Sequence, residues 1–180
     1  MGSRKLSGMF QHFERTTTDR LLLRAVREND LDAVFALHSD PTTNRFSRRG
    51  YMQTLDDARR IMGIWLEDWA RDGVGYWLVE RLDAPGVVVG LSGLRHKELE
   101  GQRVLNLAYR FTPETWGSGY ATEASRVALA LAARHLPRVP LVAIIHPENT
   151  ASLRVAERLG MRLDRHVTED GIPNRVYVIG

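Results

Sequence analysis

The chain of 180 residues contains no cysteine. That absence excludes disulfide bonds, thiolate metal sites and a cysteine nucleophile, and it agrees with the reducing cytoplasm, where we expect the protein to reside. Long apolar runs are also missing, since none approaches the roughly 20 residues of a membrane-spanning helix. Arg4 and Lys5 are not followed by the apolar stretch of a signal peptide. We therefore expect no membrane partner.

An excess of charge of one sign is missing too. There are 25 basic and 22 acidic residues, so the formal net charge is only +3. Arg48-Arg49 and Arg59-Arg60 are too short to form the clustered basic surface that nucleic-acid binding uses. We expect no nucleic-acid partner and no metal, while an anionic small ligand stays open.

The length fits a single domain, and a chain of this size can bury a core without disulfides or metals. We place the domain at residues 18–180. Residues 1–17 are expected to be an N-terminal extension, whose Gly2-Ser3 pair is of a kind that cloning adds.

Hydrophobic periodicity switches between helical and extended patterns. Thr54-Leu55-Asp56-Asp57 has the pattern of a capping box, and it opens a helical stretch that Gly73 ends. From Tyr76 the period changes to two, which is typical of strands. Helices are predicted to start at Asp30, Thr54, Gly119 and Asn149 or Thr150, with a turn at 83–86, a loop at 95–102 and strands at 20–25, 76–80, 87–94, 103–111, 139–145, 161–167 and 175–179. This pattern predicts a mixed α+β domain of about seven strands and four helices.

The most informative segment joins a predicted strand to a predicted helix and contains Trp116-Gly117-Ser118-Gly119-Tyr120-Ala121. Backbone N–H groups at a helix start have no helical partner, and the helix dipole favours negative charge there. Such a loop can bind phosphate, although a short Gly-x-Gly is often only a turn. The Lys of a P-loop and the third glycine of a dinucleotide fingerprint are both missing.

The stretch Trp116 to Ala124 resembles the pyrophosphate loop of the GNAT superfamily of acyl-CoA N-acyltransferases, most closely its Rim-type branch, which acetylates the N-termini of ribosomal proteins. Three further segments are similar to that branch, in the right order and spacing. They are Thr18 to Arg24, Asn149-Thr150-Ala151-Ser152 with Leu159-Gly160-Met161, and Asp170-Gly171 ahead of Arg175-Val176-Tyr177.

The resemblance implies a strongly twisted, mostly antiparallel sheet in which the strands near 104–111 and 141–145 run parallel and splay apart. Acetyl-CoA would lie in that gap as co-substrate. Its diphosphate would bind the loop backbone at Trp116, Gly117, Ser118, Gly119, Tyr120 and Ala121, with Asn149 and Ser152 also contacting the cofactor. Glu114 stands where relatives often carry Gln or Arg, so side-chain help to the phosphates is in doubt.

The resemblance also suggests catalytic candidates. The oxyanion donor would be a backbone N–H within 107–110, and Ser152 would lie near the sulfur as a proton donor, although Asn149 and Ser152 can equally serve only to cap a helix. Tyr109 is a candidate acid or part of the cleft wall. Asn106 replaces the carboxylate that many relatives use as a base, so that role falls to His146, His96 or water.

We predict an enzyme that transfers an acetyl group from acetyl-CoA to a primary amine, on a protein N-terminus or a small molecule. The alternative is a non-catalytic acyl-CoA sensor of the same fold, which the missing carboxylate would suit. Segments 45–69 and 95–102 would line the acceptor cleft. A homodimer is possible, and the sequence does not name the amine.

Overall fold

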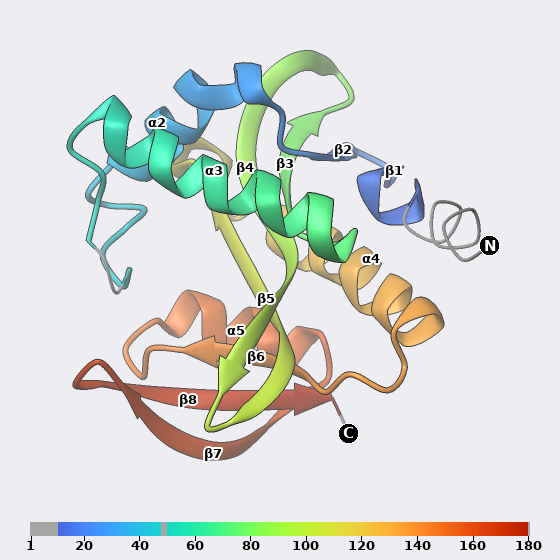
Figure 1. Ribbon diagram of the computed structural model, residues 1–180, viewed down its shortest axis with the longest axis vertical. Coiled ribbons are helices and arrows are strands. Elements are labelled where there is room, and N and C mark those ends of the chain that lie inside the picture. The colour runs from blue at the N-terminus through green and yellow to red at the C-terminus, as the bar shows by residue number, and fades with distance from the viewer. Residues whose placement is uncertain (1–10, 48–49, 180) are drawn as a thin grey trace.

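The computed structural model describes residues 11–47 and 50–179, which form one eight-stranded sheet in the order β1-β2-β3-β4-β5-β6-β8-β7. Neighbouring strands are antiparallel except β5 and β6, which are parallel. The sheet is strongly twisted (Figure 1). The strands are β1 (Arg15–Thr17), β2 (Leu21–Ala25), β3 (Tyr76–Arg81), β4 (Ala84–Leu99), β5 (Gln102–Phe111), β6 (Leu141–Ile145), β7 (Met161–Glu169) and β8 (Ile172–Ile179). The predicted mixed fold is confirmed, with one strand more than expected.

The additional strand, β1, comes from the segment that we assigned to an N-terminal extension. It pairs with β2 along its whole length. Just before it, Phe13 is fully buried, and its carbonyl accepts a hydrogen bond from the indole N–H of Trp77. Residues 11–17 therefore belong to the packed domain. The sequence signal was weak because one buried aromatic residue carries most of the contact.

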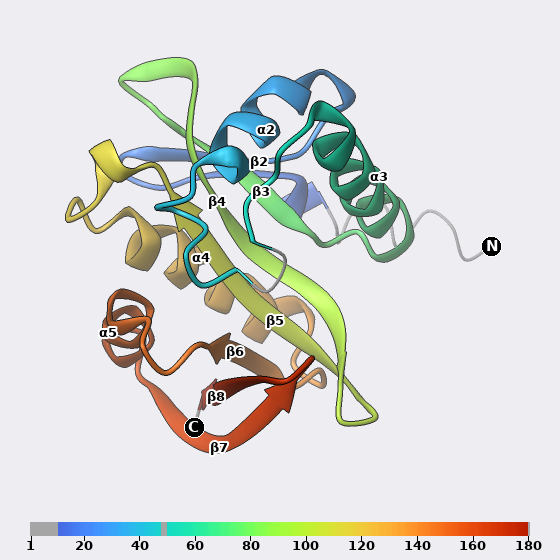
Figure 2. The same ribbon diagram turned by 90° about the vertical axis from the view of Figure 1, so that its left-hand side faces the viewer.

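Helices cover both faces of the sheet. They are α2 (Leu31–Ser39), α3 (Leu55–Asp72), α4 (Tyr120–His135) and α5 (Thr150–Arg158), with short 3-10 turns at Glu28–Asp30 and Pro113–Thr115. Leu78 and Leu91 pack with α2 and α3, whereas the neighbouring Trp77 packs with α4 and α5 on the opposite face. Figures 1 and 2 show the two pairs of helices on either side of the sheet.

Local sequence signals explain where α3 begins and ends. The hydroxyl of Thr54 accepts from the N–H of Asp57, and the Asp57 carboxylate accepts from the N–H of Thr54, both at 3.2 Å. Gly73 ends the helix with φ = 63°, in the left-handed region that favours glycine. Asp30, by contrast, lies at the N-terminus of α2 but makes no capping bond, because its carboxylate binds the Arg24 guanidinium at 2.8 Å.

The predicted turn at 83–86 lies slightly earlier, at Leu82 and Asp83, and the predicted loop at 95–102 is wrong, because β4 begins at Ala84 and continues to Leu99. Only Glu100 and Gly101 form the turn into β5, both with positive φ, as in a two-residue hairpin. The polar residues that resemble a loop in sequence are paired on the strand instead. Arg95 binds Asp68, and Lys97 binds Glu169 at 2.6 Å.

The parallel pairing of β5 with β6 is short. Only Leu105–Leu141 and Asn106–Val142 are partners, after which the strands separate, as the resemblance implies. β6 remains in the sheet because four of its residues pair with β8. The part of β5 from Leu107 to Phe111 thus has no strand partner on the β6 side among the described residues.

His38, at the end of α2, makes stability depend on pH. It is 7% exposed, and its Nδ1 bonds the Val34 carbonyl at 2.9 Å. Burial, with the nearby charge of Arg110, lowers the pKa of His38 to about 3. The unfolded chain therefore binds a proton below about pH 6.5 that the folded protein does not bind.

The free energy of unfolding should fall as the pH drops below 6.5, by roughly 2 kcal/mol from this residue at pH 5. His38→Phe should remove that part of the loss, which urea unfolding at pH 7.5 and pH 5 would measure. Replacing the exposed His166 with Gln is the control and should leave the pH dependence unchanged. An equal loss in His38→Phe and wild type would contradict the assignment.

Candidate functional site

The glycine loop leaves a set of N–H groups unused. Trp116 and Ser118 donate to carbonyls within the loop, at 3.1 and 3.3 Å. No carbonyl of the described residues accepts from the N–H of Gly117, Gly119 or Tyr120, and the same holds for Ala121 in the first turn of α4. Four of the six predicted phosphate ligands are therefore free to bind an anion, whereas Trp116 and Ser118 are engaged.

The two loop glycines are required by the backbone, with φ of 79° at Gly117 and 82° at Gly119. A Cβ atom on Gly117 would meet nothing within 4 Å, and one on Gly119 only the Arg20 guanidinium at 3.7 Å. Next to this open space, the hydroxyl of Thr122 is buried without a hydrogen-bond partner. An anionic group with several oxygens fits these donors.

A long-range network holds the loop in place. The Glu123 carboxylate, in the first turn of α4, accepts from the Thr18 hydroxyl at 2.6 Å and from Arg20 Nε at 2.8 Å. Arg20 also donates to the Ser118 carbonyl at 2.9 Å and lies over the Tyr120 ring. Burial alone would raise the pKa of Glu123, but these hydrogen bonds outweigh it and lower the pKa. The β1–β2 turn and the loop are thus one unit.

A cavity of about 440 Å³ lies beside Gly119. It brings together three arginines from distant segments, Arg20, Arg126 and Arg158, with Asp19, Thr122 and Glu123 also in its lining. These cations could not be predicted from the sequence, because what they share is their position in the fold. Glu114 is exposed and does not line this cavity.

The start of α5 faces Tyr109 across the gap between β5 and β6. The Asn149 side chain accepts from the N–H of Ser152 at 3.1 Å, so Asn149 caps α5. The Tyr109 hydroxyl donates to the Ser152 carbonyl at 3.0 Å, and burial raises the pKa of Tyr109 to about 12. The Ser152 hydroxyl makes no hydrogen bond with a described residue. The structure thus brings two catalytic candidates together at the gap.

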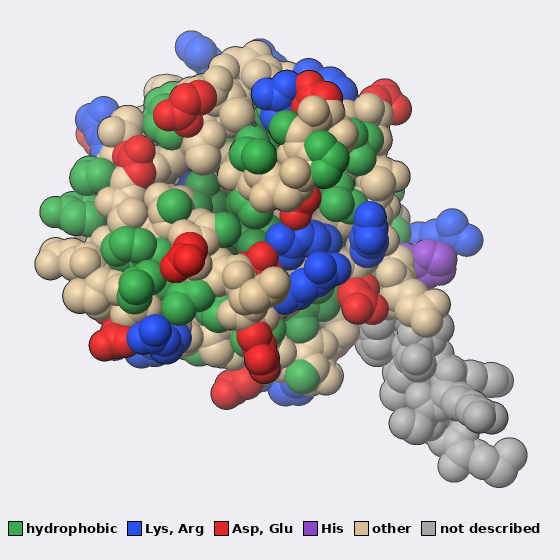
Figure 3. Space-filling model, turned by 90° about the horizontal axis from the view of Figure 1, so that it is seen from above, with side chains coloured by type: hydrophobic (Ala, Val, Ile, Leu, Met, Phe, Trp, Pro, Cys, Tyr) green, Lys and Arg blue, Asp and Glu red, His purple; other side chains and the backbone are tan. Residues whose placement is uncertain are grey.

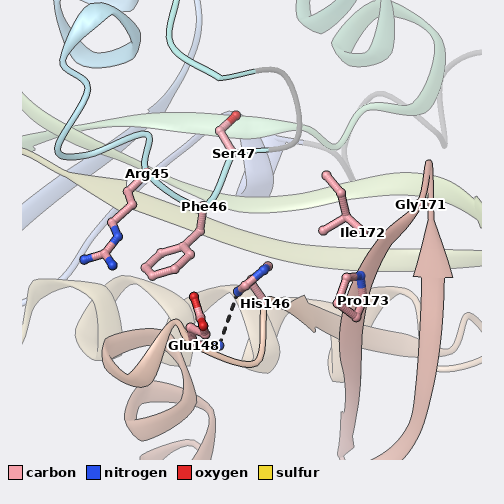
Figure 4. A pocket seen from close by; sticks show the side chains of 8 residues that line it. All are labelled: Arg45, Phe46, Ser47, His146, Glu148, Gly171, Ile172 and Pro173. Carbon is pink, nitrogen blue, oxygen red and sulfur yellow. Dashed lines mark hydrogen bonds between the residues drawn. The ribbon is translucent and has the colours of Figure 1, made fainter.

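His146 lies on the loop after β6, in a second cavity of about 340 Å³. Its ring stacks on Phe46, with 5.2 Å between ring centroids, and its Nδ1 accepts from the N–H of Glu148 at 3.2 Å (Figure 4). Arg45, Phe46 and Ser47 face the β7–β8 turn at Gly171, Ile172 and Pro173 across this cavity. Residues 45–47 of the segment 45–69 and the β7–β8 turn thus line this cavity, whereas 95–102 does not.

Asn106 points to the same side of β5 as α2 and α3. Its amide donates to the Tyr76 hydroxyl at 3.3 Å, and its carbonyl oxygen is buried without a partner. Burial raises the pKa of Tyr76, so that hydroxyl stays protonated. The charged neighbours of His96 include Asp72 and Arg103 but none of the other predicted catalytic residues. Burial lowers the pKa of His96.

Acidic and basic side chains lie next to one another on the face seen in Figure 3. Among residues 11–47 and 50–179, no group of three or more His, Asp or Glu side chains is placed to hold a metal ion. No helix in the same ranges is both long and apolar enough to cross a bilayer.

A family model described as an acetyltransferase (GNAT) domain matches residues 20–162. The protein YkkB of Bacillus subtilis (strain 168) is 31% identical over 168 residues, covering 91% of this chain and 94% of YkkB. YoaA of the same organism, an uncharacterized N-acetyltransferase, is 26% identical over 172 residues, covering 90% and 94%.

Solved structures share the fold. An acetyltransferase of Agrobacterium tumefaciens superposes with a TM-score of 0.76 at 26% identity, covering 91% of this chain and 92% of that one. RimL, a ribosomal L7/L12 alpha-N-protein acetyltransferase in complex with coenzyme A, gives 0.72 at 16% identity, covering 91% and 97%. A variant of the spermidine N-acetyltransferase SpeG of Vibrio cholerae gives 0.66 at 18% identity, covering 89% and 94%.

The hydrogen bonds of Glu123 predict the opposite effect on acetyl-CoA affinity from the one that its charge alone would have. Glu123→Ala removes a negative charge near the expected phosphates, which alone would tighten the binding of acetyl-CoA. Because it also frees Arg20 and Thr18, we expect a weaker complex, by roughly 3- to 30-fold for one or two lost charge-assisted hydrogen bonds. Isothermal titration calorimetry with acetyl-CoA measures this.

The matched control is Glu114→Gln, which removes an exposed charge from the same loop without breaking a hydrogen bond. It should leave the affinity unchanged or slightly raise it. Tighter binding in Glu123→Ala would show that charge, and not positioning, is what Glu123 contributes.

Proposed function

Since the chain belongs to the GNAT acetyltransferase family, we propose that it transfers the acetyl group of acetyl-CoA by direct attack of a primary amine on the thioester, in the gap between β5 and β6. The observation that carries this proposal is the pairing of β5 with β6 at only two positions, beside a loop with unused N–H groups. Acetyl-CoA would extend from this loop along the gap, with its phosphates bound at the loop.

The diphosphate is assigned to the N–H groups of Gly117, Gly119, Tyr120 and Ala121, which no carbonyl of the described residues occupies. Arg126 and Arg158 line the adjacent cavity and would bind further phosphate oxygens. Ser152 and Tyr109 lie further along the gap, at the end of the cofactor that carries the thioester.

Strand geometry limits which backbone N–H group within 107–110 can be the oxyanion donor. The N–H of Leu105 donates to the Pro140 carbonyl at 2.8 Å, on the β6 side. N–H groups alternate between the two sides of a strand, so those of Leu107 and Tyr109 also point toward β6. The parallel pairing of Asn106 with Val142 engages the N–H of Leu107, whereas Tyr109 lies beyond the last paired position. We assign stabilisation of the thioester oxygen to the N–H of Tyr109.

Loss of the amine proton is assigned to water. Asn106 has no titratable group, and Tyr76 is held protonated. His146 uses the Nδ1 lone pair to accept from the N–H of Glu148, so in its neutral form the proton is on Nε2. That nitrogen can donate a hydrogen bond into the cavity lined by Arg45 and Phe46 but cannot accept a proton. His96 has other neighbours. The role of His146 as a base therefore stays a prediction that this geometry does not favour.

We assign to Tyr109 and Ser152 the hydrogen bonds that stabilise the departing thiolate. A thiol has a reference pKa near ~8.5, well below the pKa of about 12 for Tyr109. Tyr109 would therefore donate a hydrogen bond to the sulfur without losing its proton. The proton that the thiolate finally takes comes from the attacking nitrogen.

The Rim-type assignment rests on the four sequence segments, because proteins described as ribosomal-protein and spermidine acetyltransferases share this fold alike. The cytoplasmic location and the homodimer likewise stay predictions.

The first test is turnover. Acetyl-CoA should raise the melting temperature, because a ligand that binds only the folded state stabilises it, and amines should release CoA that a thiol reagent detects without background from this cysteine-free chain. With water as base, kcat/KM should follow the ionisation of the amine equally in wild type and His146→Gln. A melting shift without CoA release from any amine would favour the sensor, and a profile altered by His146→Gln would reinstate the histidine.

The second test is Tyr109→Phe. If Tyr109 binds the departing sulfur, kcat should fall by roughly tenfold to a hundredfold while KM for acetyl-CoA changes little. No acidic or basic limb should disappear between pH 6 and 10, because the pKa of about 12 keeps Tyr109 protonated there. An unchanged kcat with a raised KM would make Tyr109 part of the cleft wall only.

A further inference from the structure

Arg110, near the end of β5, is a cation that is only partly exposed to solvent. No hydrogen bond or ion pair joins its guanidinium to any described residue. Burial lowers the pKa of Arg110 to about 10, so the guanidinium still carries its charge at neutral pH. An unpaired charge away from water is costly, and such groups are ordinarily paired or bind a ligand.

Two other arginines on this face of the sheet, Arg24 and Arg95, are paired with carboxylates. Cross-strand partners share a face, so Arg24 lies on the face of Leu78, and Arg110 on the face of Leu91, with which it pairs. Arg24 binds Asp30 at 2.8 Å and Glu80 at 2.6 Å. Arg95 binds the buried Asp68. The fold therefore supplies carboxylates to its structural arginines here, but not to Arg110.

The charged and titratable neighbours of Arg110 do not neutralise it. They are His38 and Tyr76, on α2 and β3. Burial lowers the pKa of His38 to about 3 and raises that of Tyr76, so both are neutral at pH 7. The local positive charge is thus left for something outside the described residues.

The position of Arg110 fits the acceptor better than the cofactor. Side chains alternate along β5, so Arg110 points away from the face on which Tyr109 reaches α5. Its face includes Asn106 and packs against α2 and α3. Arg110 directly follows Tyr109, the assigned oxyanion donor, and so begins ~3.4 Å further along the strand.

A second unpartnered group of complementary type lies on the same face of the same strand. The carbonyl oxygen of Asn106 is buried and accepts no hydrogen bond from a described residue. An amide oxygen at one end and a guanidinium at the other match an ammonium group and a carboxylate, respectively.

We propose that the acceptor amine carries a carboxylate, which Arg110 binds in a paired, charge-assisted contact while the Asn106 carbonyl orients the amino group. This inference rests on the proposed transferase function and adds the acceptor class, an amino acid or a peptide with a free carboxylate. It predicts discrimination against neutral amides and polyamines of the same length.

The experiment compares matched acceptors, each as the free carboxylate and as its amide: α-amino acids, ω-amino acids and dipeptides. Wild type should prefer at least one carboxylate over its amide by roughly tenfold to a hundredfold in kcat/KM, the expected size of a charge-assisted pair. Arg110→Gln should remove that preference and leave KM for acetyl-CoA unchanged. Arg110→Lys should restore part of it, since lysine keeps the charge without the planar fork.

Arg162→Gln is the control, since it removes an exposed arginine from β7 and should change nothing. Arg110→Gln is expected to melt no lower than wild type, because the guanidinium has no partner to lose. Equal use of amides by wild type, a preference that survives in Arg110→Gln, or a rise confined to the acetyl-CoA KM would each overturn the inference.

If no acceptor releases CoA, the same comparison is made by melting temperature on the CoA complex. A carboxylate probe that stabilises wild type but not Arg110→Gln would support the site while the transferase proposal fails. The absence of any carboxylate-specific shift would overturn the site as well.

Discussion

The early separation of β5 from β6 is the constraint on which the site depends. Two paired positions fix the register, and then each strand follows a different neighbour, β5 staying with β4 and β6 with β8. Unpaired backbone groups inside a sheet are costly, and here the N–H of Tyr109 is turned toward the gap beyond the last paired position. A substrate that supplies hydrogen bonds offsets that cost only when it is bound. The incomplete pairing of β5 with β6 thus leaves backbone hydrogen-bonding groups available to a substrate.

Contacts between distant segments hold the elements that border the gap. The Tyr109 hydroxyl joins β5 to the first turn of α5. Glu123 joins the glycine loop to the β1–β2 turn through Arg20 and Thr18. This explains why two of the sequence segments similar to the GNAT family occur together although about a hundred residues separate them. Each segment supplies half of one hydrogen-bonded network.

What could be predicted from the sequence was local. The capping box at Thr54, the left-handed Gly73 and the loop glycines each express a preference that a few neighbouring residues decide. What could not be predicted depended on partners far away. Arg95 and Lys97 resemble a loop until Asp68 and Glu169 are placed beside them. Trp116 and Ser118 looked available for phosphate until the turn of 113–115 took up their N–H groups.

The unpaired state of Arg110 could not be predicted either, because in sequence this residue does not differ from Arg24 or Arg95. Only the fold shows that those two have buried carboxylates and that Arg110 has neutral neighbours instead. The carboxylates of this face are engaged by Arg24 and Arg95, and burial keeps Tyr76 protonated and His38 neutral. A face with one positive charge that no described residue neutralises suits an acceptor that is drawn in by its own negative charge and loses its proton to water. Once bound, the acceptor's carboxylate compensates the charge of Arg110, so the guanidinium contributes to binding and orientation and not to the ionisation of the amine.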